Sequence, residues 1–410
     1  MKIQEWQKVI EWGASVRASD IFWKAGAPPC AKIRGLVERV EGWSELTPED
    51  TEWLARSLMN DRDWERFQDY PEKDIGLTIG ETCRLRINVF KQRDTHSIAM
   101  RIISLDIMTV EDLSLPLQLN DISMRPQGMV LVTGPTGCGK STTLAAMLDH
   151  INRNRQAHIL TVEDPIEYVH RDKRCLVDQR QVGTDTNDFP DALKYAMRQA
   201  PDVILIGEMR DVNTMSVAMQ AAETGHLVFS TVHTTSASET VERIVNMFPP
   251  HEKQQICMRL SRSLEAVISQ SLIPRSDTQG GRVGALEIMV VTPTIAKFIE
   301  EGKPGEMYAA MEEGAHWGMQ TMNQALLQLY LDEVVTQDHA MFYSGNRTQM
   351  RQMLRRADGL AADAAAEEAK KQAQAQKRRP QRPAAAPAGS GSTPRPSSPP
   401  DAEGGSPTAQ

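Results

Sequence analysis

Four short hydrophobic segments recur through the middle of the chain, at residues 129–132, 158–162, 203–206 and 227–232. Each is nearly all apolar, which is the pattern of strands buried on both faces of a parallel sheet. Helical patterns separate several of these segments. We therefore predict an α/β fold for this region, in which helices cover both faces of a parallel sheet.

The first 115 residues are patterned differently. Apolar residues recur at helical spacing from Ile3 to Val16, which predicts an amphipathic helix. Short strand-like segments follow at residues 20–23, 31–34, 83–90 and 98–103, and the last two could pair as neighbours. We predict a small α+β domain over residues 1–115.

After Pro274 a mixed segment runs to Leu354 and contains amphipathic helices such as residues 319–334. We assign residues 116–357 to one domain that ends in helices. Residues 358–410 are dominated by Ala, Pro, Gly, Ser and Gln. Such a segment buries too little apolar surface to offset the entropy of ordering it, so we predict a disordered tail. The tail could be a solubilising tether or a docking arm for an acidic partner.

A glycine-rich loop follows the first hydrophobic segment. The pattern G-x-x-x-x-G-K-[ST] is met by Gly134, Pro135, Thr136, Gly137, Cys138, Gly139, Lys140 and Ser141, and a predicted helix starts at Thr142. This strand–loop–helix context indicates a P-loop, whose backbone N–H groups bind phosphate at a helix N-terminus. We predict ATP binding by residues 134–142, with the Lys140 ammonium at the phosphates and the Ser141 hydroxyl on Mg²⁺. A thiol near a helix N-terminus tends to have a lowered pKa, but we expect Cys138 to be a loop residue that contributes only its backbone.

Acidic residues and a histidine end the other three segments. Glu163 follows the second segment, Glu208 the third and His233 the fourth. The carboxyl ends of parallel strands share one edge, where the ligands of open α/β sheets collect. Hydrolysis of a bound nucleotide needs one group that positions water and another that anchors the metal ion. The two glutamates are the candidates for these roles, and the histidine could donate a hydrogen bond to the γ-phosphate.

Composition narrows the class of protein. The formal net charge of −8 over 410 residues argues against a protein that coats nucleic acid. Five cysteines without a C-x-x-C pair favour free thiols in a reducing compartment over disulfides or a zinc site. We expect no signal peptide, and no apolar run reaches the ~18 residues that span a bilayer. A cytoplasmic protein is expected, and peripheral attachment to a membrane partner stays open.

The motifs, in their order along the chain, resemble those of the secretion ATPases. Residues 134–142, 159–167, 198–211 and 223–234 look like the Walker A motif, the Asp box, the Walker B motif and the His box of that family. The sequence Gly-Met-Gln-Thr-Met at 318–322 also resembles the type IV pilus retraction ATPases of the PilT/PilU group. The similarity runs from the N-terminus to about residue 355 and leaves the tail unmatched.

The resemblance implies a homohexameric ring that couples ATP hydrolysis to pilus disassembly through an inner-membrane platform protein. It also implies a PAS-like domain before a RecA-like ATPase domain. Glu163 would be the general base, Glu208 would hold Mg²⁺ through water, and His233 would sense the γ-phosphate. Arginines would complete the site, because guanidinium groups stay charged and bind phosphate through two hydrogen bonds. The matching positions are Arg84, Arg86, Arg101, Arg198 and Arg210.

Two departures from the family pattern keep other functions open. Where retraction ATPases carry Ala-Ile-Arg, this chain has Thr294-Ile295-Ala296-Lys297. An accessory PilU-like ring member, acting beside a paralogous retraction ATPase, is therefore an alternative to independent retraction. The absence of paired cysteines excludes the four-cysteine zinc module of many extension and type II secretion ATPases. A related type II or type IV secretion motor is the third possibility.

Overall fold

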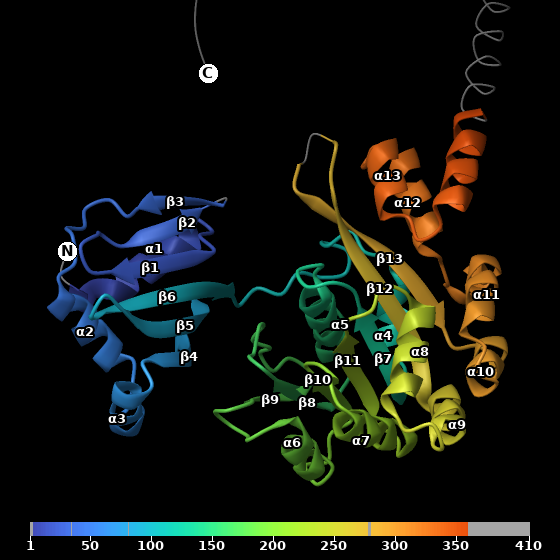
Figure 1. Cartoon of the computed structure of the whole chain (residues 1–410), viewed down its shortest axis with the longest axis horizontal. Coiled ribbons are helices and arrows are strands. Elements are labelled where there is room, and N and C mark those ends of the chain that lie inside the picture. The colour runs from blue at the N-terminus through green and yellow to red at the C-terminus, as the bar shows by residue number, and fades with distance from the viewer. Residues whose placement is uncertain (1–2, 34, 81, 278–279, 360–410) are drawn as a thin grey trace, which may run out of the picture. The chain divides into compact units, whose positions relative to one another are not determined.

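The computed structural model of the protein describes residues 3–33, 35–80, 82–277 and 280–359. Two β-sheets organise this part of the chain: a six-stranded sheet from its N-terminal part and a seven-stranded sheet after it (Figure 1). The predicted tail from residue 360 on lies outside the described residues. None of the helices in the described ranges combines the length and apolar character that a membrane span requires.

The N-terminal sheet has the order β3-β2-β1-β6-β5-β4, and all of its neighbours are antiparallel. Its strands are β1 (Asp20–Lys24), β2 (Cys30–Ile33), β3 (Leu36–Arg39), β4 (Glu72–Ile79), β5 (Cys83–Gln92) and β6 (Thr95–Ser104). The helices beside it are η1 (Ile3–Glu5), α1 (Trp6–Ser15), α2 (Pro48–Ser57) and α3 (Asp61–Asp69). The predicted pairing of segments 83–90 and 98–103 is confirmed, since β5 pairs with β6.

One face of this sheet is buried. Along β5 the side chains of Leu85, Ile87 and Val89 are fully buried, and they alternate with residues that reach solvent. This period of two is what a strand with one covered face requires. Residues 36–39, 48–57, 61–69 and 72–79 form strands and helices that we did not predict, because their sequences are rich in charged residues. The likeness of this domain to PAS domains stays a prediction.

The second sheet has the order β13-β12-β7-β11-β10-β8-β9. Its strands are β7 (Gly128–Thr133), β8 (His158–Glu163), β9 (Leu176–Gln181), β10 (Val203–Ile206), β11 (Leu227–Val232), β12 (Leu264–Pro274) and β13 (Arg282–Val290). All neighbours are parallel except β12 and β13, which are antiparallel. The four predicted strands are confirmed as β7, β8, β10 and β11. The α/β class is also confirmed, although β13 makes the sheet mixed rather than purely parallel.

The helices of this region are α4 (Gln118–Ser123), α5 (Lys140–Asn154), α6 (Phe189–Ala196), α7 (Val212–Glu223), α8 (Ala237–Met247), α9 (Lys253–Ser263), α10 (Pro293–Glu300), η2 (Pro304–Glu306), α11 (Met307–Glu313), η3 (Ala315–Trp317), α12 (Met322–Leu331) and α13 (Gln337–Tyr343). Strand order decides which face each crossover helix covers. The chain moves one way along the sheet from β7 to β8 and returns through β10 to β11. Because such crossovers are right-handed, α5 lies on the opposite face from α6 and α7.

One predicted helix of the C-terminal region is shorter in the structure. The helix expected over residues 319–334 is α12, which covers only Met322–Leu331. Before it, Gln320 pairs its backbone with Ile288, and Thr321 caps the helix through the backbone N–H of Gln324. After it, Glu333 adopts a positive φ, which ends a helix. A further helical run covers residues 347–359, where the described part of the chain ends.

Candidate nucleotide-binding and catalytic site

The glycine-rich loop lies where the sequence places it, between β7 and α5. Its glycines Gly134, Gly137 and Gly139 all adopt positive φ, a conformation that side chains disfavour. At Gly134 there is also no room, because a Cβ atom would lie 2.4 Å from the backbone oxygen of Gln270. The loop therefore closes directly onto the neighbouring strand β12.

Lys140 opens α5 and reaches back over the loop. Its Nζ donates hydrogen bonds to the carbonyl oxygens of Gly134 (2.9 Å) and Pro135 (3.0 Å). Among the described residues no side chain caps the first turn of α5, so the N–H groups of that turn are available to an anion. The loop thus presents an ammonium group and a helix N-terminus together, which is the arrangement that binds phosphate.

Gln270 on β12 braces the loop from behind. Its Nε2 donates to the carbonyl oxygen of Cys138 (2.8 Å), and its Oε1 accepts from the hydroxyl of Thr143 (2.7 Å). The side chain is buried, and both ends of its amide are used. We did not identify this residue from the sequence, because it lies 132 residues after Cys138 in the chain and β12 carries no motif.

A cavity of about 570 Å³ opens in front of the loop. It is lined by six of the predicted phosphate-binding residues, namely Thr136, Gly137, Gly139, Lys140, Ser141 and Thr142, and by Glu163, Glu208, Arg210 and His233. Gly134, Pro135 and Cys138 belong to the loop but do not line the cavity. The strand ends meet here in the order β7, β11, β10, β8, so His233 follows the strand next to the loop and Glu163 ends the most distant one.

Glu163 ends β8 and is almost completely buried. Its Oε1 accepts hydrogen bonds from the Thr161 hydroxyl (2.6 Å) and from Nε2 of Gln179 (3.1 Å). Burial raises the pKa of this carboxyl above its usual range, while these hydrogen bonds act in the opposite direction. A buried carboxylate whose pKa moves toward neutrality is suited to accept a proton.

Glu208 and His233 lie on neighbouring strand ends. Nε2 of His233 is 3.8 Å from Oε2 of Glu208, and the same oxygen lies 2.7 Å from Nε of Arg210. The Glu208 side chain is mostly buried, whereas the Arg210 side chain is 74% exposed. A half-exposed imidazole and an exposed guanidinium thus flank one carboxylate at the cavity wall.

Cys138 lies in the middle of the P-loop. Its side chain is buried behind the loop, and burial raises the pKa of the thiol, although the charge of Lys140 and backbone hydrogen bonds oppose this. Loss of hydration therefore outweighs the lowering that a nearby helix N-terminus tends to cause. Like the other four cysteines, this residue is a free thiol.

The remaining predicted arginines do not line this cavity in the described part of the chain. Arg198 is exposed just after α6. Arg84 and Arg86 lie two apart on β5, and Arg101 on β6 is paired directly with Arg86, so all three share the face of the N-terminal sheet opposite its buried one. Arg101 pairs with Asp20 there at 3.0 Å. Their part in the site stays a prediction.

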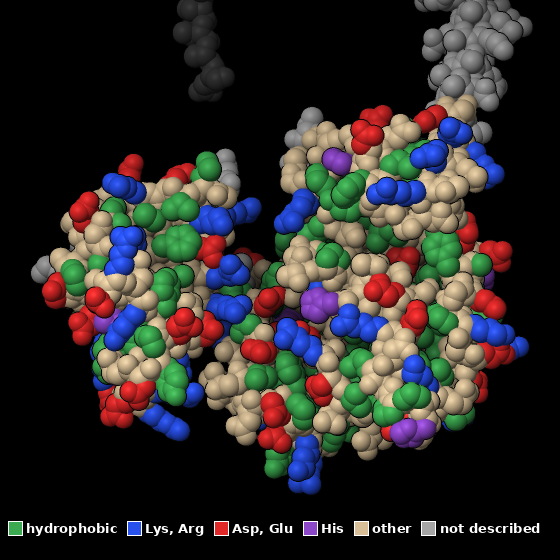
Figure 2. All heavy atoms as spheres, in the orientation of Figure 1, with side chains coloured by type: hydrophobic (Ala, Val, Ile, Leu, Met, Phe, Trp, Pro, Cys, Tyr) green, Lys and Arg blue, Asp and Glu red, His purple; other side chains and the backbone are tan. Residues whose placement is uncertain are grey.

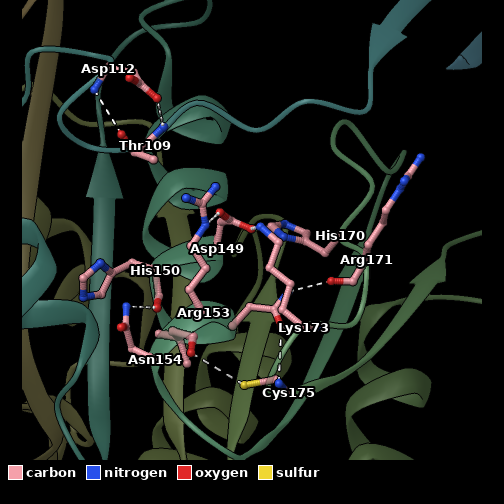
Figure 3. Close-up of polar contacts among 12 residues, drawn as sticks. Thr109, Asp112, Asp149, His150, Arg153, Asn154, His170, Arg171, Lys173 and Cys175 are labelled. Atoms are coloured by element: carbon pink, nitrogen blue, oxygen red, sulfur yellow. Dashed lines mark hydrogen bonds and ion pairs between the residues drawn. The ribbon is translucent and has the colours of Figure 1, made fainter. Parts of the chain in front are cut away.

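The loop after β8 is fastened to α5 (Figure 3). Lys173 and Arg153 both form ion pairs with the buried carboxylate of Asp149. Asn152, fully buried on α5, donates to the carbonyl oxygen of Arg171 (2.7 Å) and accepts from the backbone N–H of Lys173 (3.1 Å). The wall of the cavity that includes Tyr168 and His170 is therefore tied to the helix that follows the P-loop.

Several lining residues carried no signal in the sequence. Tyr168, His170, Leu272 and Arg282 line the cavity, but each stands outside the recognised motif positions. The described residues hold no group of three or more His, Cys, Asp and Glu side chains arranged to bind a metal ion. On the face drawn in Figure 2, acidic and basic side chains are interspersed over the molecule.

A P-loop at the edge of an open α/β sheet, with carboxylates at the neighbouring strand ends, defines a P-loop ATPase. Comparison with known proteins gives the family. Residues 58–386 match the type II/IV secretion system protein family. The chain is 44% identical over 333 residues to the type IV pilus retraction ATPase PilT of Pseudomonas aeruginosa, a match that covers 81% of this chain and 96% of that protein. The chain belongs to the type II/IV secretion system family and, within it, to the pilus retraction ATPases of the PilT/PilU type.

Other relatives agree. The type IV pilus ATPase PilU of Pseudomonas aeruginosa is 38% identical over 359 residues, covering 88% of this chain and 94% of that protein. The crystal structure of the pilus retraction motor PilT with bound ADP superposes with a TM-score of 0.79 at 41% identity, over 86% of this chain and 99% of that one. The ATPase DotB of Legionella pneumophila has a TM-score of 0.71 at 25% identity, over 83% and 95% of the two chains.

Proposed function

We propose that this protein is an ATP-hydrolysing motor that forms a homohexamer and drives type IV pilus retraction, and hence twitching motility, through an inner-membrane platform protein. The observation that carries the hydrolytic part is the cavity that joins Lys140 of the P-loop to Glu163 and Glu208. The pilus substrate rests on the similarity to the retraction ATPase PilT, and the cytoplasmic location at the inner membrane rests on the resemblance of the motifs to that family.

In this proposal the P-loop holds the nucleotide. The N–H groups of the first turn of α5 and the ammonium of Lys140 bind the β and γ phosphates, because both concentrate positive charge at one point. Glu163 accepts a proton from the attacking water, for which its raised pKa suits it. His233 contacts the γ-phosphate and reports its loss. Arg84, Arg86, Arg101, Arg198 and Arg210 neutralise charge that develops on the phosphate oxygens.

The residues present fit a magnesium ion. The Ser141 hydroxyl and the Glu208 carboxylate both line the cavity, and oxygen ligands of this kind are those Mg²⁺ prefers, with several waters retained. The ion supplies charge neutralisation at the phosphate oxygens. Ser141 would hold it directly and Glu208 through water, so that the protein contributes few ligands.

The purified full-length protein tests the hydrolytic site. We expect Lys140→Ala and Glu163→Gln to fold but to lose ATP turnover by roughly 100-fold or more, in line with the loss of a phosphate-binding charge or of a general base. Lys194→Ala, an exposed lysine on α6 outside the cavity, is the control and should keep wild-type turnover. Full turnover in Lys140→Ala would refute the mechanism.

The biological role is tested in cells. A deletion strain should extend pili but fail to retract them, and the wild-type gene but not Glu163→Gln should restore twitching. A strain that twitches normally yet fails to export a protein would instead show a secretion motor.

An accessory, PilU-like role is the second candidate. The match to PilU spans 359 residues of this chain, more than the 333 matched to PilT. Moreover, Ala296 stands where the retraction ATPases carry the arginine of Ala-Ile-Arg. ATP hydrolysis by the purified protein without any partner argues against a purely accessory role. Activity that appears only with a paralogous retraction ATPase supports it.

A further inference from the structure

Two donors hold one oxygen of the Glu163 carboxylate. The hydroxyl of Thr161 lies 2.6 Å from Oε1, and Nε2 of Gln179 lies 3.1 Å from the same atom. Thr161 is fully buried and Glu163 nearly so. With two hydrogen bonds converging on one oxygen, the carboxylate cannot rotate about its terminal bond without losing both of them.

Strand pairing produces this arrangement. Thr161 and Glu163 are two residues apart on β8, so their side chains leave the same face of the sheet. Gln179 on β9 is in direct register with Thr161, which places its side chain beside both of them. The donors are therefore placed by the backbone register of β8 and the edge strand β9.

The orientation of the Gln179 amide is determined by its other contacts. Its Oε1 accepts from the backbone N–H of His170 (2.8 Å), and its Nε2 donates to the carbonyl oxygen of Tyr168 (2.8 Å). An N–H group can only donate, so the amide oxygen must face His170. The NH₂ group is then directed at Tyr168 and at the Glu163 carboxylate, and all of its hydrogens are used.

The same amide connects Glu163 to the P-loop region. The phenol of Tyr168 is 2.8 Å from the hydroxyl of Thr142, in the first turn of α5. The chain that follows Tyr168 is held on α5 by Asn152 and Asp149, as Figure 3 shows for its partners Arg171 and Lys173. The position of the Glu163 carboxylate is thus fixed relative to the helix whose N-terminus binds phosphate.

We propose that Thr161 and Gln179 are positioning residues, which hold the Glu163 carboxylate in the orientation that activates the attacking water. This inference rests on the general-base role proposed above for Glu163. Neither residue reaches the nucleotide cavity itself, since neither lines it. They act through Glu163, by keeping one of its oxygens occupied and its plane fixed.

A matched pair of variants tests the proposal in the full-length protein with Mg²⁺ and ATP. Thr161→Val removes the hydroxyl at nearly constant shape, and Thr161→Ser retains it. We expect Thr161→Val to lower kcat roughly 10- to 100-fold, the range for a lost hydrogen bond to a charged group, with little change in KM for ATP. Thr161→Ser should stay close to wild type. A merely structural role would lower the melting temperature of both without this split between kcat and KM.

Gln179→Leu is a second test of the positioning role. It should lower kcat in the same range, but it also deprives Tyr168 and His170 of their hydrogen-bond partner, so its folding must be checked. Single-turnover rates of Glu163→Gln with and without Thr161→Val complete a double-mutant cycle. Because the two residues act through Glu163, Thr161→Val should cause no further loss there.

The outcomes separate the two claims. Wild-type turnover in Glu163→Gln would overturn the general-base role itself. If Glu163→Gln loses turnover while Thr161→Val matches Thr161→Ser, the general base stands and the positioning role is overturned. A full additional loss from Thr161→Val in the Glu163→Gln background, or an effect on KM alone, overturns the positioning role as well.

Discussion

The side-chain amide of Gln270 donates a hydrogen bond to the carbonyl oxygen of Cys138, at 2.8 Å, and so ties strand β12 to the middle of the P-loop. The same amide accepts from Thr143, in the first turn of α5. One buried side chain therefore contacts both the loop and the helix that would hold the phosphates. The shape of the P-loop depends on this brace as well as on its own glycines.

Gln270→Leu is expected to weaken nucleotide binding. The substitution leaves the Cys138 carbonyl and the Thr143 hydroxyl without their buried partner, which costs about 1–3 kcal/mol for each group left unpaired. Part of this free-energy cost appears as lower stability and part as weaker ATP binding. The Kd for ATP is measured by titration with a fluorescent nucleotide and should rise. Gln254→Leu, at an exposed glutamine of α9, serves as control and should bind as wild type. An unchanged Kd in Gln270→Leu would show that the loop keeps its shape unaided.

Gly134→Ala and Gly137→Ala form a second matched pair. Both glycines have positive φ, so each substitution strains the backbone by about 1–2 kcal/mol. Only at Gly134 would the new Cβ also meet backbone, the oxygen of Gln270 at 2.4 Å, whereas at Gly137 nothing lies within 4 Å. We expect Gly134→Ala to be clearly the less stable in urea unfolding and to lose nucleotide binding. Equal stability of the two variants would contradict the close approach of the loop to β12.

The stability of the protein should fall between pH 6.5 and pH 4 partly because of His170. Burial lowers the pKa of this imidazole to about 4, although the charge of Asp149 acts in the opposite direction. In the unfolded chain the pKa is near its usual value, so in this window only the unfolded state takes up the proton. The neutral folded form is therefore fully favoured above pH 6.5, and this contribution, on the order of 3 kcal/mol, is lost as the pH falls to 4.

Urea unfolding of the wild type and of His170→Leu across this pH range checks the effect. The variant should lose less stability on acidification than the wild type does. His251→Leu, at an exposed histidine, should follow the wild-type curve. Parallel curves for the wild type and His170→Leu would mean that His170 titrates normally in the folded protein.

Cys138 should react slowly with thiol reagents. Its thiol is buried and has a raised pKa, and the thiolate is the reactive form. At pH 7.5 we expect iodoacetamide to modify the partly exposed Cys30 well before Cys138, as followed by peptide mass spectrometry. Preferential modification of Cys138 would show that the helix N-terminus dominates its chemistry after all.

Much of the fold could be predicted from local patterns. The strands β7, β8, β10 and β11 are buried on both faces of the sheet, so their sequences are nearly all apolar. Each strand could therefore be recognised from its own residues alone. The P-loop and the residues at the strand ends, Glu163, Glu208 and His233, follow from the same segments. Charged segments such as α3 and β4 were missed, because an element with one exposed face leaves a weak hydrophobic signal.

Only the tertiary structure decided how these parts meet. Strand order places His233 beside the P-loop strand and Glu163 at the far end of the group, since hydrogen-bonded pairing between distant strands leaves no mark on sequence spacing. For the same reason, the contacts of Gln179 on β9 with Glu163 and of Gln270 on β12 with the P-loop could not be predicted. Burial, which depends on every neighbour in space, raises the pKa of both Cys138 and Glu163. Residue types and local periodicity were thus readable from the chain alone, whereas register, desolvation and long-range hydrogen bonds required the folded protein.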